Sequence, residues 1–188
     1  MGGVGINYLP QDQAQPFSFF FDPVIKRVKE YFGEEDLPIL VSEPGRSIVG
    51  EAGLTLYRIG TIKNIPDIKN YLAVDGGMTD NIRLALYQAK YHAEIINKLG
   101  HDKDTMYTVV GKCCESGGIL IHDIYLLKAS RGDILAVFST GAYCYSMASN
   151  YNMMTKPAIV WVKEGQDYLV TKAQTIEQIY QNDLVYPL

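Results

Sequence analysis

Two glycine-containing segments near the start of the sequence have residue types that bind phosphate. One is Gly2-Gly3, and the other is Gly45-Arg46, which follows the short apolar run 39–41. Glycine lacks a Cβ, so its backbone N–H groups can approach a phosphate closely, and arginine adds a charged bidentate donor. Each segment alone is typical of an ordinary turn. If each segment follows a strand of the same parallel sheet, the two segments lie at the same edge of that sheet. Together they then predict a phosphate site.

Arg83 and Tyr87 lie four residues apart after the glycine-rich turn 75–77. A guanidinium and a phenol four residues apart at the mouth of a β domain can bind the carboxylate of a substrate. The alternative is a surface arginine in a loop.

The segment 111–117 places a thiol beside a carboxylate, Cys114 next to Glu115. Such a thiol can donate a proton, with a pKa set by its surroundings. The alternative is that Cys113 and Cys114 are packed as small apolar side chains. There is no C-x-x-C motif, and the three histidines lack ligand spacing, so the sequence argues against a metal site.

Tyr143 follows Gly141 directly after the apolar run 134–138, where its phenol can reach a phosphate or a carboxylate. The alternative is a tyrosine of the core. The sequence has 14 tyrosines, and eight of them lie between Tyr57 and Tyr145. This cluster indicates a pocket or a subunit interface, or else a β-rich core that uses tyrosine.

Length and composition restrict the class of protein. The chain has 188 residues, is 47% apolar and carries a net charge of -4 without a basic cluster, which argues against binding to nucleic acid or an anionic membrane. No apolar stretch approaches the roughly 20 residues that span a bilayer. With no secretory signal and only three cysteines, the sequence predicts a soluble, cytoplasmic protein.

Residues 1–46 read as the end of a β/α barrel. Asp22-Pro23 predicts the start of a helix whose apolar stripe ends at Gly33, and 39–41 predicts a buried strand of a parallel sheet. Because a closed (β/α)8 barrel takes about 250 residues, we expect this region to be the tail of a truncated barrel.

Residues 47–188 predict a mainly β domain, an antiparallel sandwich or barrel, with a short final helix capped by Thr175. Short apolar runs separated by glycine-containing turns give the expected strands: 54–62, 71–74, 107–110, 119–127, 134–138, 158–162 and 168–170.

In order along the chain, these motifs resemble one family. They are Glu43-Pro44-Gly45-Arg46, V-D-G-G-M-T-D-N-I-R at 74–83, A-L-Y at 85–87, G-K-C-C-E-S-G at 111–117 and G-A-Y at 141–143. The resemblance is to the diaminopimelate decarboxylases, pyridoxal-phosphate enzymes with an alanine-racemase-like fold. It covers essentially the whole chain, and C-E-S-G favours this branch over the ornithine branch, whose loop usually carries C-D.

The resemblance implies pyridoxal 5'-phosphate as the cofactor. It assigns cofactor contacts to Gly2, Gly3, Glu43, Pro44, Gly45, Arg46 and Tyr143. Glu43 would face the pyridine nitrogen and keep it protonated. The glycines and Arg46 would hold the phosphate, and Arg46 would also reach a substrate carboxylate.

For the substrate, the resemblance implies meso-diaminopimelate, converted to L-lysine and CO₂ in lysine biosynthesis. Arg83 and Tyr87 would bind its distal amino-acid end, and Tyr143 would contact phosphate and substrate. Cys114 and Glu115 would enter the active site of the other subunit of a homodimer. There Cys114 would reprotonate the substrate carbon, and Glu115 would bind the distal ammonium.

Three departures from the family pattern matter. The family's cofactor-binding lysine lies upstream of the position matching residue 1, and none of the lysines here has its context. Gly118 stands where aspartate is usual, and Leu84 stands where proline is usual. We therefore expect the chain alone to be inactive. Two alternatives stay open. One is a non-catalytic split-gene or truncated module for dimerisation or interaction, which could pair with an N-terminal barrel fragment. The other is a related ornithine- or arginine-type decarboxylase.

Overall fold

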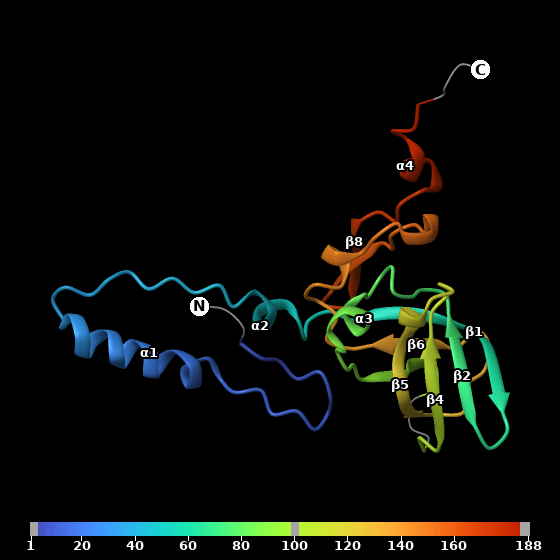
Figure 1. The fold of residues 1–188 in the computed structure, drawn as a ribbon, viewed down its shortest axis with the longest axis horizontal. Coiled ribbons are helices and arrows are strands. Elements are labelled where there is room, and N and C mark those ends of the chain that lie inside the picture. Colours follow the sequence, from blue (N-terminus) through green and yellow to red (C-terminus); the bar gives the residue numbers. More distant parts are fainter. Residues whose placement is uncertain (1–3, 99–101, 185–188) are drawn as a thin grey trace.

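A computed structural model describes residues 4–98 and 102–184 of the chain. Its centre is a six-stranded sheet in the order β3-β6-β1-β2-β4-β5, and a separate hairpin pairs β7 with β8 (Figure 1). The strands are β1 Thr55–Ile65, β2 Lys69–Val74, β3 Ala93–Ile95, β4 Thr105–Val110, β5 Ile119–Leu126, β6 Ile134–Val137, β7 Ile159–Lys163 and β8 Gln166–Thr171.

The predicted mainly β architecture is confirmed. All seven expected runs form strands, and neighbouring strands are antiparallel except for the β2–β4 pair. The sheet is barrel-like and nearly closed, because its two edge strands, β3 and β5, contact each other. The sequence did not indicate β3, which has only three residues and pairs with β6 alone.

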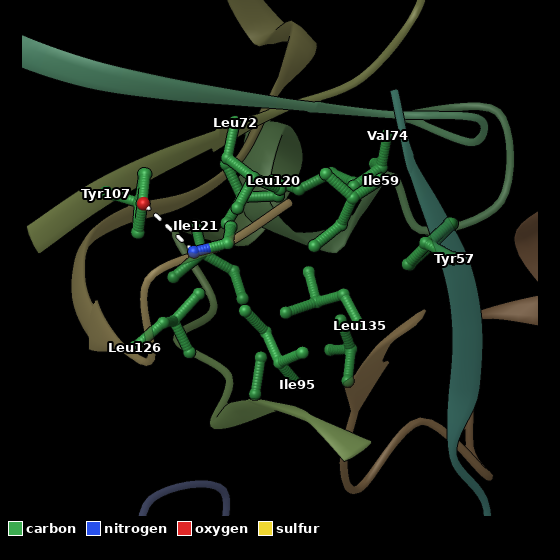
Figure 2. Packing of buried hydrophobic residues seen from close by; sticks show 14 of the residues in the cluster. Tyr57, Ile59, Leu72, Val74, Ile95, Tyr107, Leu120, Ile121, Leu126 and Leu135 are labelled. Carbon is green, nitrogen blue, oxygen red and sulfur yellow. Dashed lines mark hydrogen bonds between the residues drawn. The ribbon is translucent and has the colours of Figure 1, made fainter. Parts of the chain in front are cut away.

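The core lies inside this curved sheet (Figure 2). Leu72, Leu126 and Leu135 have no exposed surface, and Ile59 is 1% exposed. These residues come from four different strands, and their alternation with exposed neighbours along β1 is the pattern of a strand with one buried face.

Helix α1, Phe17–Phe32, begins earlier than the sequence indicates. It was predicted to start at Asp22-Pro23, but Pro23 lies inside the helix. A proline there removes only the hydrogen bond to the carbonyl of Phe19, and the apolar residues before it continue the helix. Its predicted end is confirmed, since Gly33 follows with φ of 77°, a left-handed conformation suited to glycine.

The expected strand at 39–41 does not form. No strand is assigned to this segment, and Ile39 is 93% exposed. The prediction required a neighbouring strand of a parallel sheet, and neither sheet of the described chain extends to residues 39–41. The exposed apolar surface continues on α1, which has no buried residue (Figure 1, the blue segment).

The remaining helices are short: α2 Gly45–Val49, α3 Arg83–Tyr87 and α4 Ile176–Tyr180. The expected cap of the last helix is confirmed, because Thr175 and Gln178 form a reciprocal capping box. Single 3-10 turns occupy Ile96–Lys98, Ser116–Gly118, Tyr145–Met147 and Tyr151–Met153.

Within residues 4–98 and 102–184, no helix has both the length and the apolar character to cross a bilayer. In the same residues, no three His, Cys, Asp or Glu side chains are grouped as a metal site would require.

The core predicts a clear contrast between two apolar substitutions. Leu135→Ala leaves a cavity in a fully buried position and should lower the free energy of unfolding by about 2–5 kcal/mol. Ile68→Ala, at a position 75% exposed, should change it by less than about 0.5 kcal/mol. Urea unfolding of both variants tests this, and equal effects would contradict the packing described.

The surroundings of Asp133, in the turn before β6, predict that this residue makes a pH-dependent contribution to the free energy of unfolding. Its carboxylate accepts hydrogen bonds from Lys98 Nζ at 2.7 Å, Asn97 Nδ2 at 2.9 Å and the backbone N–H of Ser130 at 2.7 Å. Burial alone would raise the pKa of this carboxyl, but the hydrogen bonds, that from Lys98 foremost, lower it below its ordinary value.

A lowered folded-state pKa stabilises the protein above the unfolded pKa of about 3.9, and this contribution is lost as the pH falls through the folded value. Asp133→Asn should therefore lower the free energy of unfolding by about 1–3 kcal/mol at pH 7. The difference from wild type should stay constant between about pH 8 and 5 and shrink below about pH 4. Urea unfolding at several pH values measures this difference in the free energy of unfolding. A difference that increases toward acid pH would contradict the prediction.

Candidate functional site

Of the two phosphate-type segments, the structure describes Gly45-Arg46 and the residues that follow Gly2-Gly3. The guanidinium of Arg46, in α2, donates to the backbone carbonyl of Val4 over 3.4 Å from both Nε and Nη2. Val4 and Ile6 are buried, and a Cβ added to Gly50 would lie 2.4 Å from the Ile6 side chain. The segment at 4–6 is therefore fixed against α2. Gly2 and Gly3 themselves lie outside the described residues.

Glu43 and Gly45 are exposed beside Arg46, and Pro44 is half-buried. The carboxylate of Glu43 forms no ion pair or hydrogen bond within the described chain. This set combines a carboxylate, a glycine backbone with open space at its Cα and a guanidinium. Such groups suit a ligand with a phosphate and a protonated ring nitrogen, because the arginine pairs with the first and the glutamate with the second.

Close backbone contacts hold the loop that carries Tyr143. The N–H of Gly141 donates to the carbonyl of Gly50 at 3.0 Å, and a Cβ on Gly141 would lie 1.9 Å from the carbonyl oxygen of Val49. Glycine is thus required there. Tyr143 follows in a left-handed conformation, φ 66°, with its side chain 49% exposed.

Arg83 is buried, with 8% of its surface exposed, and opens α3. It is not a surface arginine in a loop. Its Nη1 donates to the hydroxyl of Tyr8 at 2.7 Å and to that of Tyr91 at 2.8 Å. The guanidinium carbon also lies 5.6 Å from the ring centroid of Tyr143. The structure therefore brings together Arg83 and Tyr143, two residues that the sequence had singled out separately.

The hydrogen bonds around Arg83 extend to a thiol. The Tyr91 hydroxyl and Cys144 Sγ are 3.5 Å apart, and both residues are 3% exposed. Burial raises the pKa of Tyr91 well above its ordinary value, with a further increase from Cys144. Burial also raises the pKa of the Cys144 thiol. Both groups are therefore neutral near pH 7, and neither supplies a negative charge to Arg83.

The loop at 111–118 carries the predicted thiol and carboxylate. Of the cysteine pair, Cys113 is buried and Cys114 is exposed, so the alternative of two packed cysteines holds for only one of them. Glu115 is exposed and accepts a short hydrogen bond from the hydroxyl of Tyr151. This bond raises the pKa of the Tyr151 hydroxyl.

Glycine contacts anchor the same loop. A Cβ on Gly111 would lie 2.5 Å from the Cα of Gly77, and the N–H of Lys112 donates to the carbonyl of Gly76 at 2.9 Å. A Cβ on Gly117 would meet the side chain of Ala85 at 3.0 Å, so the loop lies against α3.

Some of the predicted site residues have side chains that make no polar contact with the rest of the described chain. Tyr87, at the end of α3, is 62% exposed. Like Glu43, the side chains of Tyr87 and Cys114 make no hydrogen bond or ion pair with residues that the structure describes.

The sequence did not reveal four residues that contact the predicted ones: Tyr8, Tyr91, Cys144 and Tyr151. Tyr91 and Cys144 belong to the tyrosine-rich stretch, which had indicated a pocket in general terms. Tyr8 and Tyr151 lie outside it, 75 and 36 residues from their partners. No local pattern could have paired them.

Gly118 gives a test of the loop. A Cβ there would lie 2.7 Å from the carbonyl oxygen of Cys113, so Gly118→Ala must displace the backbone beside Cys114. We expect a loss of about 1–3 kcal/mol in the free energy of unfolding. Gly60→Ala is the matched control, because its Cβ would sit at an ordinary 3.6 Å from the nearest atom. Unfolding of both variants at the same urea concentration would contradict the close contact between Gly118 and the carbonyl of Cys113.

Comparison with known proteins gives a family match. Residues 19–141 match the family described as "Pyridoxal-dependent decarboxylase, C-terminal sheet domain". This range includes all but the first two residues of α1, the six-stranded sheet and the loop at 111–118.

Individual relatives agree with the family match. The chain is 49% identical over 187 residues to the diaminopimelate decarboxylase of Bacillus subtilis and 50% identical over 173 residues to that of Bacillus methanolicus. It spans only 43% and 40% of their lengths, while 98% and 91% of this chain is matched.

The fold is also similar to a solved structure. The crystal structure of diaminopimelate decarboxylase from M. jannaschii, in a complex with L-lysine, superimposes with a TM-score of 0.91 at 33% identity. The match covers 99% of this chain and 42% of that chain.

Proposed function

Because this chain belongs to the pyridoxal-dependent decarboxylases and forms their C-terminal sheet domain, we propose that it is the C-terminal part of a diaminopimelate decarboxylase. The complete enzyme would release CO₂ from meso-diaminopimelate and form L-lysine. The observation that carries this proposal is the pairing of Arg83 with Tyr143. It sets a guanidinium beside a phenol, and such a pair can bind the carboxylate of a substrate's second amino-acid end.

Residues 43–46 fit pyridoxal 5'-phosphate as the cofactor. Glu43 would pair with the protonated ring nitrogen, while Arg46 and the backbone of Gly45 would hold the phosphate, with Pro44 shaping the turn between them. When bound, this cofactor would supply an electron-withdrawing ring for the substrate carbon that loses CO₂. Supporting this placement, Arg46 is already tied to Val4, which directly follows Gly2-Gly3.

Substrate recognition falls to the residues around α3. Arg83 would bind the distal carboxylate, and Tyr87, exposed one helical turn later, would add a hydroxyl. Tyr143 would contact both phosphate and substrate. Glu115 would pair with the distal ammonium. A site that pairs both distal charges rejects lysine or ornithine, because its polar groups would be left unpaired.

Cys114 would return a proton to the carbon that has lost CO₂. Adding the proton to only one face of that carbon requires an acid that is held in a fixed position. Cys114 and Glu115 are both exposed on this chain, so a second subunit would have to enclose them. We therefore propose a homodimer in which each loop at 111–118 completes the active site of the partner.

We also propose that the chain divides near residue 46. Residues 1–46 would be the end of the β/α barrel, and 47–188 would form the substrate- and partner-binding β domain. The exposed apolar residues of α1 and of 39–41 support this, since large apolar patches mark surfaces that pack against other protein. The rest of the barrel, in one chain or as a separate fragment, would cover them.

A chimera tests the proposal. This chain would replace the matching 43% of the Bacillus subtilis enzyme, which then supplies the rest of the barrel. With pyridoxal phosphate, the chimera should release CO₂ from meso-diaminopimelate, and Cys114→Ala should lower kcat by a factor of about 10²–10⁴. The chain alone should release none.

Two outcomes would go against this reading. A folded chimera that binds pyridoxal phosphate but releases no CO₂ would indicate a non-catalytic module. A chimera that prefers ornithine or arginine would place the chain in the other branch of the family. Gly60→Ala in the same chimera controls for nonspecific effects of substitution in the β domain.

A further inference from the structure

The nitrogens of the Arg83 guanidinium differ in their hydrogen bonding. Of its five N–H donors, the two on Nη1 are taken by the hydroxyls of Tyr8 and Tyr91. The donors on Nε and Nη2 have no partner in the described part of the chain. These two nitrogens form the fork that binds a carboxylate in a bidentate manner.

The Nε–Nη2 edge is not sealed inside the protein. Within residues 4–98 and 102–184, the hydroxyl of Tyr57 is the one fully buried side-chain polar atom without a hydrogen-bond partner. Nε and Nη2 of Arg83 also lack partners, so both must keep some contact with solvent. This edge therefore keeps contact with solvent, although the residue is 92% buried by the fold.

No carboxylate neutralises this charge. Arg83 forms no ion pair with any described residue, and its contacts are the neutral side chains of Tyr8, Tyr91 and Tyr143. A buried charge is normally paired, because removing it from water is costly. The arrangement holds a cation in place for an anion that the described chain does not supply.

The two tyrosines are themselves fixed. Their rings pack edge to face with centroids 5.3 Å apart and an interplanar angle of 88°. The backbone carbonyl of Tyr8 also accepts the N–H of His92 at 3.0 Å, which ties the segment of Tyr8 to the entry of β3. Neither ring can turn away from Arg83 without losing its edge-to-face contact with the other.

We propose that Tyr8 and Tyr91 are positioning residues that hold Nη1 of Arg83, so that its Nε–Nη2 edge faces a carboxylate of the bound ligand. This inference rests on the proposed function for the identity of the ligand, whose distal carboxylate would occupy that edge. The tyrosines touch Arg83 and act on the ligand only through it.

Kinetics of the chimera provide the first test. Tyr8→Phe and Tyr91→Phe keep the rings and remove only the hydroxyls. The double variant should raise KM for meso-diaminopimelate about tenfold or more, with kcat changed less than about threefold, because the loss is one of binding. Because two hydrogen bonds to a charged group are lost, the melting temperature should also fall, by roughly 6–24 °C. Tyr125→Phe, at a position 56% exposed on β5, is the matched control and should change neither constant.

An unchanged KM in the double variant would overturn the proposal. So would a fall in kcat and melting temperature with KM unaltered, since that would make the tyrosines only structural.

A second readout does not depend on decarboxylation. Pimelate, a seven-carbon dicarboxylate, is titrated into the chain labelled with ¹⁵N while the Nε–H signal of Arg83 is followed by NMR. The signal should shift in wild type and in Tyr125→Phe. In Tyr8→Phe/Tyr91→Phe the affinity should fall about tenfold. If this pattern holds while the chimera is inactive, the proposed function fails and the positioning role stands. If pimelate leaves the wild-type signal unmoved, the positioning role is wrong.

Discussion

A buried arginine without a carboxylate partner is the constraint on which this arrangement depends. Arg83 must be held by hydrogen bonds, and the fold provides them from places far apart in the sequence, Tyr8 in the N-terminal segment and Tyr91 next to β3. Because both phenols must be in reach, the N-terminal segment has to pack on the β domain. The burial of Val4 and Ile6 provides the apolar part of that contact.

Glycines make the other close contacts possible. Gly141 approaches the carbonyl of Val49, and Gly111 approaches Gly77, at separations that leave no room for a side chain. The first contact sets the loop of Tyr143 against the end of α2, and the second holds the loop at 111–118. The groups proposed for cofactor, substrate and proton transfer are thus placed by backbone contacts between loops. The closed core of the sheet gives these loops a fixed base (Figure 2).

Local patterns in the sequence were enough for much of the fold. Short apolar runs between turns identified β1 and β5, and Thr175 as a cap identified α4, because these signals depend on neighbours in sequence. The start of α1 and the strand expected at 39–41 were wrong, since helix continuation through Pro23 and strand pairing both depend on context. In the site, Arg83 and Tyr143 were found from residue type. Tyr8 and Tyr151 were not, because their contacts span long stretches of chain.

A crystal structure of the chimera with pyridoxal phosphate and pimelate would test the central claim most directly. The account predicts that Nη1 of Arg83 keeps its bonds to Tyr8 and Tyr91 while Nε and Nη2 lie about 3 Å from a pimelate carboxylate. It would be contradicted if that carboxylate bound elsewhere, or if Nε and Nη2 were bonded to protein groups with the ligand present.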